Sequence, residues 1–435
     1  MDGLAVDAPA VRYDPQSFQG NLRGAKERYG SALCNCKTSP LQLVIRERMG
    51  KLFLAAWPDQ AAIHALDCPF YSEHRESAGR YAPEAIERDG DVTRVALSHP
   101  LMHQNRNQEW SEPKERAPAT TPGADRGQGP KTTMHLWGLV HYLWEEAGLN
   151  RWYPGWHRDW GLVRYLLRRV AQNTMVGDKP LLDSLYIPPV WNSKKQYDIQ
   201  QHWNQFHAIL FKNNRRCEMV ASGFVIGTVR SLEQSEFGNV IQLHHHSARF
   251  YMDQRISDNV AHYSRRGWAA AKHLEVASDS RDRPYVVAAM RVESSSTGRM
   301  AIVEVALMRV SPRYIPVSSS YEDRLARHLI ELDRQFVKPL HYDNHNIALP
   351  DFVLKDVLEV DGTGGEHANS VAIYVYGPAI TPQQKPRIEA ADRKYAKEAG
   401  LGYWQWDVAQ NRELPDLPLA IEKPVRLSSS QPLQG

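Results

Sequence analysis

Hydrophobic positions in the middle of the chain follow a helical period. The stretch MHLWGLVHYLWEEAGL, residues 134–149, places five apolar side chains on one helix face, and Gly148 is a typical helix stop. The stretch DWGLVRYLLRRVAQNT, residues 159–174, predicts a second helix with a core stripe. Its arginines, Arg164, Arg168 and Arg169, suit either a solvated flank or a flank that faces phosphate.

Residues 207–311 change to the alternation that is typical of strands. The segments HAILF, MVASGFVIGTV, NVIQLHH, YVVAAMRVE and MAIVEVALMRV predict an antiparallel or mixed sheet. The tract of His244, His245 and His246 falls within it. Because neighbouring side chains on a strand point to opposite faces, at most two of them can converge on a metal. We interpret this tract as structural.

The carboxyl-terminal part predicts a helix, three strands, a helix and a strand. Ser319 and Glu322 form a capping signature at the start of the first helix, over SSSYEDRLARHLIELDRQF, and Glu322 falls on its apolar stripe. FVKPLHYD, ALPDFVL and VLEVDG are the three predicted strands, the last two joined by a turn near Lys355. A helix over 386–399, ended by Gly400, and the strand YWQWDV complete the order.

Three acids occupy convergent positions in this region. A tight hairpin would bring Glu359 beside Asp351, and Glu359 shares one strand face with Asp361 because side chains alternate. Glu322 sits at the end of the helix face that should pack on the sheet, where a carboxylate needs a partner or a metal. The pattern therefore predicts a cluster of carboxylates.

Three of the four cysteines cluster near the amino end, which favours metal binding over disulfides. Cys34 and Cys36 form one close pair, and His64 and Cys68 form another, with His74 as an alternative to His64. Thiolates and an imidazole in this number suit a closed tetrahedral zinc site. Such a site has no open coordination position, so we expect it to stabilise a small module or to contact nucleic acid.

Length and composition set the organisation of the chain. At 435 residues, two or three domains are expected, and a formal charge of +3 means that a nucleic-acid surface would have to be local. Residues 105–132 are rich in Pro, Gly and charge and predict a linker. No stretch reaches the roughly 18 apolar residues of a membrane span. The amino end lacks a signal-peptide pattern, so we expect a cytoplasmic protein with no membrane partner.

These patterns together predict an α+β multidomain fold. Residues 20–104 form a small zinc-binding module in this prediction, and residues 133–311 form a central region of helices and β-sheet. Residues 317–410 form the carboxyl-terminal domain, which is followed by a flexible tail over residues 411–435.

The element order over 317–410, with Pro-Asp at 350–351 and Glu359 on the next predicted strand, resembles the PD-(D/E)XK nuclease superfamily, the fold of many restriction and repair endonucleases. The resemblance implies a restriction-endonuclease-like α/β domain in which Asp351 and Glu359 hold Mg²⁺ or Mn²⁺ and Glu322 supports the metal. Such an ion polarises the scissile phosphate and helps to ionise the attacking water.

In this superfamily a lysine two positions after the glutamate steadies the attacking water, and Asp361 stands at that position here. Either the cation comes from elsewhere or the domain does not cleave. Lys385 and Arg387, at the start of the helix over 386–399, are the preferred replacements, and Lys394 is a third. In some members of the superfamily this helix donates a migrated lysine.

The whole chain also resembles an uncharacterised bacterial family, DUF1173, often carried on conjugative plasmids and integrative elements. The features that carry the resemblance are CNC with HALDC, LWGLVHYLWEEAGLNRW, and RYIPVSSSYEDRLARHLIELDRQFVKPLHYD running into LPDFVL and LEVDG. We expect a divalent-metal-dependent DNA endonuclease of a mobile element. The alternatives are a catalytically inactive nuclease fold that binds nucleic acid, and an interaction scaffold for conjugation or integrative-element proteins.

Overall fold

The computed structural model divides the chain into two compact units, residues 1–79 and residues 80–435. It describes residues 6, 11, 15–48, 51–57, 64, 68, 70, 85–89, 92–98, 101–104, 133–210, 219–236, 238–274, 283–294, 298–340, 349–360, 366–378, 380, 383 and 385–421. The predicted linker over 105–132 lies outside them. The prediction of a mixed α+β fold is confirmed. Within the described residues, no helix is long and apolar enough to cross a membrane.

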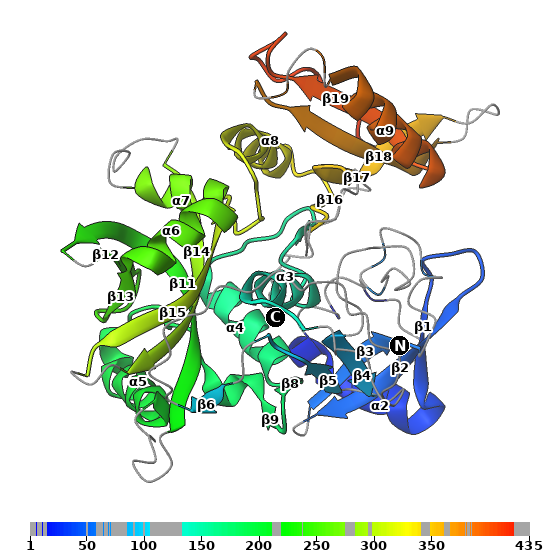
Figure 1. The fold of residues 1–435 in the computed structure, drawn as a ribbon. Coiled ribbons are helices and arrows are strands. Elements are labelled where there is room, and N and C mark those ends of the chain that lie inside the picture. The colour runs from blue at the N-terminus through cyan, green and yellow to red at the C-terminus, as the bar shows by residue number, and fades with distance from the viewer. Residues whose placement is uncertain are drawn as a thin grey trace, which may run out of the picture. The chain divides into compact units, whose positions relative to one another are not determined.

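The first unit packs a helix on a three-stranded antiparallel sheet, drawn in blue in Figure 1. The helix buries Leu22 and Ala25 in a cluster that also contains Cys34 and Cys68. It ends at Gly30, whose φ of 67° is the left-handed conformation that favours glycine. The elements are a short 3-10 helix (Pro15–Phe18), α2 (Gln19–Tyr29), β1 (Ser31–Cys34), β2 (Leu41–Arg48) and β3 (Lys51–Ala56).

The second unit contains a mixed sheet whose pairings close on themselves. Strand β11 pairs antiparallel with β14 along residues 222–228 and with β12 along residues 229–235. Strand β12 pairs with β13, β13 pairs parallel with β15, and β15 pairs with β14. The strands are β6 (Met102–Gln104), β10 (Leu185–Tyr186), β11 (Met219–Ser235), β12 (Gly238–Leu243), β13 (Arg249–Asp253), β14 (Tyr285–Ser294) and β15 (Met300–Val310).

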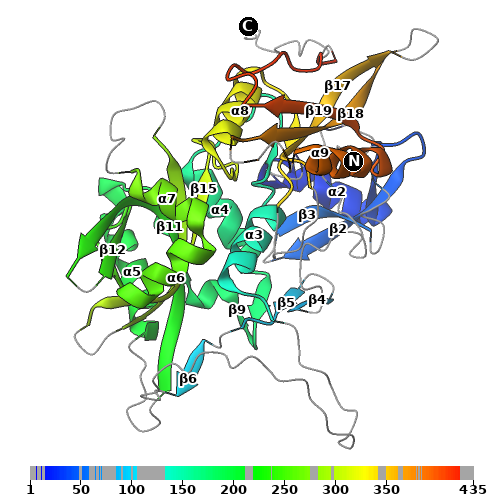
Figure 2. The same ribbon diagram turned by 45° about the horizontal axis from the view of Figure 1, so that its top comes forward.

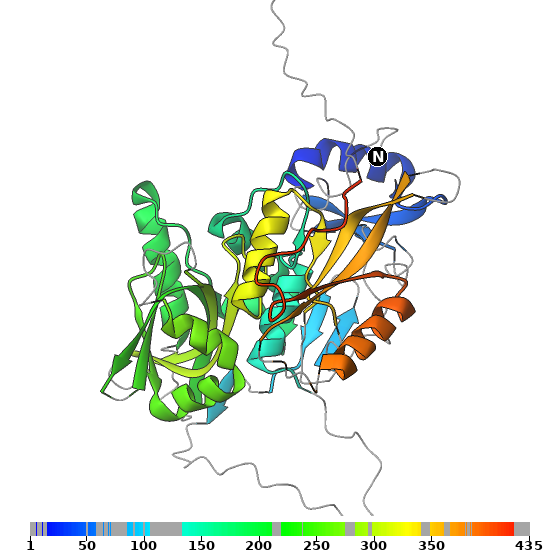
Figure 3. The ribbon, with the colours of Figure 1, turned by 90° about the horizontal axis from the view of Figure 1, so that it is seen from above.

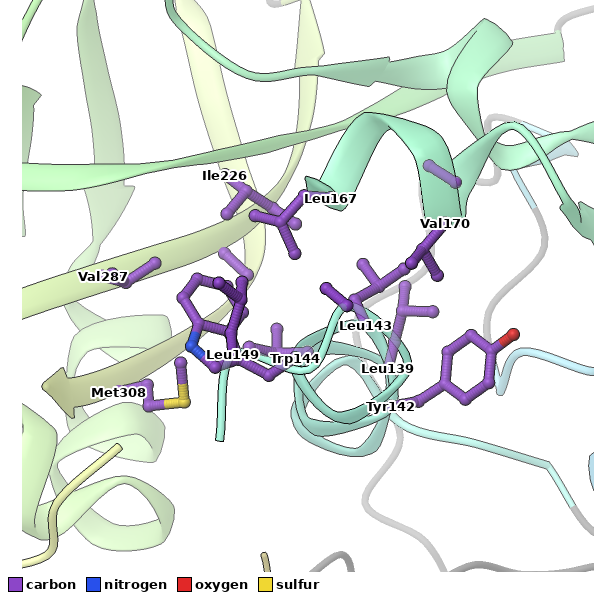
Figure 4. Packing of buried hydrophobic residues seen from close by; sticks show 14 of the residues in the cluster. Leu139, Tyr142, Leu143, Trp144, Leu149, Leu167, Val170, Ile226, Val287 and Met308 are labelled. Atoms are coloured by element: carbon purple, nitrogen blue, oxygen red, sulfur yellow. The ribbon is translucent and has the colours of Figure 1, made fainter. Parts of the chain in front are cut away.

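Helices pack on two sides of this sheet because neighbouring strand residues point in opposite directions. Trp144 of α3 and Leu167 of α4 lie in one buried cluster with Ile226 of β11 (Figure 4). Val225 belongs to a second cluster with residues of α5, α6 and α7, and Figure 2 shows α6 and α7 over the sheet. The helices are α3 (Leu136–Glu146), α4 (Trp160–Ala171), α5 (Gln196–Leu210), α6 (Gln254–Tyr263) and α7 (Arg265–Lys272). Both helices predicted in 134–174 are thus confirmed.

Residues 86–104 also belong to the second unit, although the sequence placed them in the amino-terminal module. Strand β5 pairs parallel with β8, and β6 pairs with the first residues of β11. The small sheet consists of β4 (Ile86–Asp89), β5 (Val92–Val95), β8 (Thr174–Val176) and β9 (Lys179–Pro180). Two further 3-10 helices cover Leu181–Ser184 and Ser193–Lys195.

A five-stranded sheet in the order β19-β18-β17-β16-β7 carries the carboxyl-terminal part. All its pairings are antiparallel except β18 with β19. Helix α8 packs on one face through Leu325 and Leu329, and α9 packs on the other through Ala396 (Figure 3). The elements are β7 (Arg151–Trp152), α8 (Ser320–Glu331), β16 (Phe336–Val337), β17 (Phe352–Val360), β18 (Glu366–Tyr376), α9 (Lys385–Glu398) and β19 (Gly402–Asp407).

The predicted turn near Lys355 is wrong, because β17 is one continuous strand. The polar pair Lys355-Asp356 marks a shift of register between Leu354 and Val357. Asp356 is buried there, and Arg334 donates a hydrogen bond to its carboxylate (Nε to Oδ1, 3.0 Å). A buried ion pair thus sits where the sequence predicted an exposed turn.

Two neighbouring predictions change with it. The third strand of this region is β18, which the sequence did not predict. Phe336, which the sequence placed both at the end of the first helix and at the start of the strand FVKPLHYD, lies in β16. The predicted tail begins as ordered chain: the N–H of Ile421 donates to the carbonyl of Asp356 (2.9 Å).

Candidate functional site

Four possible metal ligands converge in the first unit. The Sγ atoms of Cys34 and Cys68 lie 3.4 Å apart, and Nδ1 of His64 lies 3.3 Å from Sγ of Cys36 and 3.5 Å from Sγ of Cys68. The four ligand atoms all lie within 4.8 Å of one another. The three cysteines are free thiols. The alternative ligand His74 lies outside the described residues.

The donor set fits a metal such as zinc. Zinc–sulfur bonds of about 2.3 Å in a tetrahedron hold two sulfurs roughly 3.8 Å apart, close to the separation found here. Cys34, His64 and Cys68 are buried. Nε2 of His64 has no hydrogen-bond partner among the described residues, so only Nδ1, the nitrogen that faces the sulfurs, is engaged. The predicted set of Cys34, Cys36, His64 and Cys68 could therefore hold a metal.

Hydrogen bonding and burial shift the pKa values of the two closest thiols in opposite directions. Hydrogen bonding to Cys68 lowers the pKa of the Cys34 thiol to about 5. The same hydrogen bond, together with burial, raises the pKa of Cys68. The two closest thiols therefore differ in how readily they ionise, and a cation bound between them would favour the thiolate form of both.

In the second unit, two carboxylates meet at a lysine. Glu322 lies buried in the first turn of α8, where its N–H donates to the capping hydroxyl of Ser319 (3.1 Å). Lys338 directly follows β16, and Asp351 directly precedes β17. Nζ of Lys338 lies 2.7 Å from Oε2 of Glu322 and 3.6 Å from Oδ1 of Asp351.

Backbone groups hold each member of this cluster in place. The N–H of Ser318 donates to Oε2 of Glu322 (2.9 Å), and the N–H of Val375 donates to Oδ2 of Asp351 (2.7 Å). The N–H of Lys338 donates to the carbonyl of Asn150 (2.7 Å), whose side-chain amide donates back to the Lys338 carbonyl (3.0 Å). Three separate segments, around residues 150, 318 and 375, therefore hold the three charged residues in place.

The cluster combines two fixed charges with one carboxyl group that titrates near neutrality. Burial raises the pKa of Asp351 to about 7, and the neighbouring Glu322 adds to the rise. Burial also disfavours charge on Glu322, but Lys338 outweighs it and lowers the pKa of Glu322. Burial lowers the pKa of Lys338, yet the two acids outweigh it and raise that pKa. The Asp351 side chain is 24% exposed, so it alone of the three meets solvent.

The structure does not bring Glu359 to this cluster. Glu359 lies eight residues beyond Asp351 along the same extended chain, roughly 26 Å away at the rise of a strand. It is exposed and pairs across the sheet with His367. Their predicted convergence depended on the hairpin that is absent. Asp361 lies outside the described residues.

The cations predicted on α9 have other partners or face solvent. Lys385 forms an ion pair with Asp407 at the end of β19 and lies 3.6 Å from Glu389. Arg387 is exposed, and Lys394 lies 3.8 Å from Glu398 on the helix surface. The cation that does lie beside Asp351 is Lys338.

Lys338 was missed by the sequence reasoning, although a signal was present. It stands in the apolar run FVKPL, and a lysine in such a run is seldom buried without an acidic partner. The predicted replacement cations, Lys385, Arg387 and Lys394, all lie downstream of Asp351. The lysine that meets the acids lies between them in the sequence, directly after β16, the strand that pairs with β17.

Comparison with known proteins gives one match. The family model DUF1173, described as a protein of unknown function, matches residues 5–409. No curated protein and no solved structure matches the chain. The matched range includes both the Cys/His cluster and the Glu322–Lys338–Asp351 cluster.

Proposed function

Since this chain belongs to the DUF1173 family, whose description assigns no activity, we propose a function from the site itself: divalent-metal-dependent hydrolysis of phosphodiester bonds in DNA. The observation that carries the proposal is the meeting of Glu322 and Asp351 with the ammonium group of Lys338. Carboxylate oxygens suit Mg²⁺ and Mn²⁺, and a lysine beside them can balance the charge that develops on a phosphate.

The arrangement of the carboxyl-terminal elements supports the resemblance to the PD-(D/E)XK superfamily. Helix α8, strands β16, β17 and β18, helix α9 and strand β19 follow one another along the chain. The first three strands pair antiparallel in sequence order, and β19 joins β18 in parallel. Pro350 and Asp351 stand directly before the second strand.

In this proposal, Glu322 and Asp351 hold the ion, which when bound polarises the scissile phosphate and lowers the pKa of a water. Asp351 is the accessible ligand. The N–H of Val375 donates to Oδ2 of Asp351, and Oδ1 is the oxygen that faces Lys338. Lys338 keeps Glu322 ionised and supplies the positive charge that Asp361 cannot.

For the first unit we propose a structural zinc ion held by Cys34, Cys36, His64 and Cys68. Four protein ligands fill a tetrahedral shell, so no position remains for substrate. The ligands lie in the same buried cluster as the helix and sheet residues of this small unit, so the metal would stabilise its fold.

The hydrolase proposal is tested by cleavage of supercoiled plasmid and of a single-stranded oligonucleotide, each with Mg²⁺ or Mn²⁺. Asp351→Asn and Glu322→Gln should each lower the cleavage rate by at least about 100-fold, since each removes charge from the reacting centre. Glu331→Gln, an exposed acid on the same helix, and Lys397→Ala, an exposed lysine on α9, should cleave like the wild type. Absence of cleavage by the wild type with either metal, or undiminished cleavage by Asp351→Asn, would contradict the proposal.

Binding of nucleic acid without cleavage is the second candidate, and the tightness of the Lys338–Glu322 pair favours it. At 2.7 Å the ammonium occupies an oxygen that a metal would need. The β18 residues opposite Asp351, Ile373 to Val375, also carry no acid. DNA retention by the wild type without cleavage, unchanged in Glu322→Gln, would establish this function instead. Association with conjugation or integrative-element proteins stays a prediction from the resemblance.

A further inference from the structure

A surface on α4 and the following segment combines exposed aromatic rings with cations that have no acidic partner among the described residues. We propose that it binds single-stranded DNA, stacking bases on its rings and pairing phosphates with its cations. We call it the aromatic–basic surface; its members are Arg164, Tyr165, Arg168, Trp191, Lys194 and Lys195. This proposal rests on the proposed function, which supplies DNA as the partner, and adds that the bound DNA is single-stranded.

The segment 187–191 runs along α4 and brings the two parts of the surface together. Nε of Arg164 donates to the carbonyl of Ile187 (2.9 Å), and the indole N–H of Trp160 donates to the carbonyl of Pro188 (2.7 Å). A Cβ built on Gly161 would lie 3.9 Å from Cγ2 of Val190. Tyr165 is one helical turn beyond Gly161, so its ring shares a side of α4 with this segment.

The aromatic side chains of this surface are unusually exposed. Trp191 is 54% exposed, Tyr165 is 43% exposed, and Tyr197 nearby is 73% exposed. Every residue from 190 to 198 is exposed, whereas Val163 and Leu167 of α4 are fully buried. A group of exposed rings beside a well-packed helix indicates a binding surface rather than a poorly formed core.

The charges of the surface are positive and lack acidic partners. Arg164 and Arg168 lie one turn apart on α4, and Arg168 has no hydrogen-bond or ion-pair partner among the described residues. Burial lowers the pKa of both arginines, and the like charge of Arg168 adds to the effect on Arg164. Within the described part of the chain, the ammonium groups of Lys194 and Lys195 also form no ion pair. A bound phosphate would offset the repulsion between the Arg164 and Arg168 guanidinium groups.

The combination of rings and cations favours a single strand over a duplex. A single strand exposes the faces of its bases, and each base stacked on an aromatic side chain contributes about 1–3 kcal/mol. A duplex hides those faces and would contact only the cations. An acidic peptide would likewise satisfy the charges and leave the rings without a role.

The test measures fluorescence anisotropy of a labelled 20-nucleotide oligo(dT), and of the same strand annealed to oligo(dA), without divalent metal. The wild type should bind the single strand at least about 10-fold more tightly. Trp191→Ala and Tyr165→Ala should each weaken single-strand binding by about 5- to 150-fold, the equivalent of one lost stack. Combined Lys194→Gln and Lys195→Gln should reduce the slope of log affinity against log salt by about 1.4, or 0.7 per lost phosphate contact.

Matched controls are Tyr29→Ala, an equally exposed ring in the first unit, and Lys397→Gln, an exposed lysine on α9. Both should bind like the wild type. Ultraviolet cross-linking of oligo(dT), mapped by mass spectrometry, should label Trp191 or Tyr165. Equal affinity for duplex and single strand, unchanged binding by Trp191→Ala, or no binding at low salt would overturn the proposal.

Binding and cleavage fail separately in this design, because binding is measured without divalent metal. If the wild-type protein binds single strands through Trp191 but cleaves no DNA, this inference stands and the hydrolase proposal is contradicted. If the wild-type protein cleaves DNA and Trp191→Ala binds single strands as tightly as the wild type, the hydrolase proposal stands and this inference is overturned.

Discussion

The buried charges of Lys338 and Glu322 make each other necessary. Nζ of Lys338 is nearly inaccessible to water and is 2.7 Å from Glu322, so neither charge could be solvated if the other were removed. Phe352 adds a ring whose centroid lies 5.0 Å from the same ammonium group. The cluster is therefore a structural element as well as a candidate site.

Lys338→Met should lower the free energy of unfolding by about 3–5 kcal/mol, because it leaves Glu322 buried and unpaired. Adding Glu322→Gln removes that charge, and the double variant should recover most of the loss. Urea denaturation of the single and double variants measures the difference, with Lys397→Met as the exposed control. A double variant as unstable as Lys338→Met would show that the pair is not coupled.

Asp351 should make stability depend on pH. Its pKa is raised to about 7 in the folded chain, so the unfolded chain releases this proton first as the pH rises. Stability from this group therefore falls between about pH 4 and pH 7 and stays constant above. Asp351→Asn cannot ionise and still accepts the Val375 hydrogen bond, so relative to the wild type it should gain stability over that range, by at most roughly 4 kcal/mol.

Urea midpoints of the wild type and Asp351→Asn at pH 5 and at pH 8 check this expectation. The variant should exceed the wild type by clearly more at pH 8. A difference that is the same at both pH values would mean that Asp351 titrates in its ordinary range.

At the scale of elements, α7 depends on a glycine that lets it approach β15. A Cβ built on Gly267 would lie 1.7 Å from the carbonyl oxygen of Leu307, a backbone atom that cannot move aside alone. Gly267→Ala should therefore destabilise the second unit by about 3 kcal/mol or more, at or above the upper end of overpacking costs.

The control for this change is Gly20→Ala on α2, where a Cβ would meet nothing within 4 Å. That substitution should be neutral or stabilising by up to about 1 kcal/mol. Thermal unfolding of both variants measures the effect. An unchanged melting temperature for Gly267→Ala would contradict the close approach of α7 to β15.

Elements set by local signals could be predicted from the sequence, and those set by distant pairing could not. Ser319 caps α8, and Gly148 and Gly400 adopt positive φ directly beyond helices, as their local sequences indicated. The spacing of Cys34, Cys36, His64 and Cys68 likewise predicted their convergence.

The errors arose where a residue's neighbours lie far away in the sequence. From the local sequence, Lys355 and Asp356 look like a turn. Arg334, which pairs with Asp356 from the segment between α8 and β16, is distant in the sequence. Lys338 lies beside Asp351 because β16 pairs with β17. Polar residues inside apolar runs indicated that a partner exists, but they did not say which residue it is.

At the scale of the whole molecule, the division into two units predicts separate responses to metal. Purified protein should contain about one equivalent of zinc, lost in Cys34→Ser, with Cys217→Ser as a control since the sequence sets Cys217 apart from the other three. Removal of zinc should unfold residues 1–79 and leave residues 80–435 folded.

Limited proteolysis with and without a chelator checks this result. Chelation should expose the first unit and leave a resistant fragment that begins near residue 80. A metal-free preparation with the same digestion pattern as the untreated protein would refute the structural zinc ion.

The two paired strands β7 and β16 are synthesised at very different times. Arg151 and Trp152 pair with Val337 and Phe336, so the edge strand of the last sheet is made long before the strand that it joins. At roughly 5–20 residues per second, the interval is about 10–40 s. During that interval Asn150 has already been synthesised and Lys338 has not. The two residues later form two hydrogen bonds with each other. The charged cluster can therefore assemble only after Asp351 has been synthesised, so a nascent chain stalled before residue 338 would lack the proposed activity.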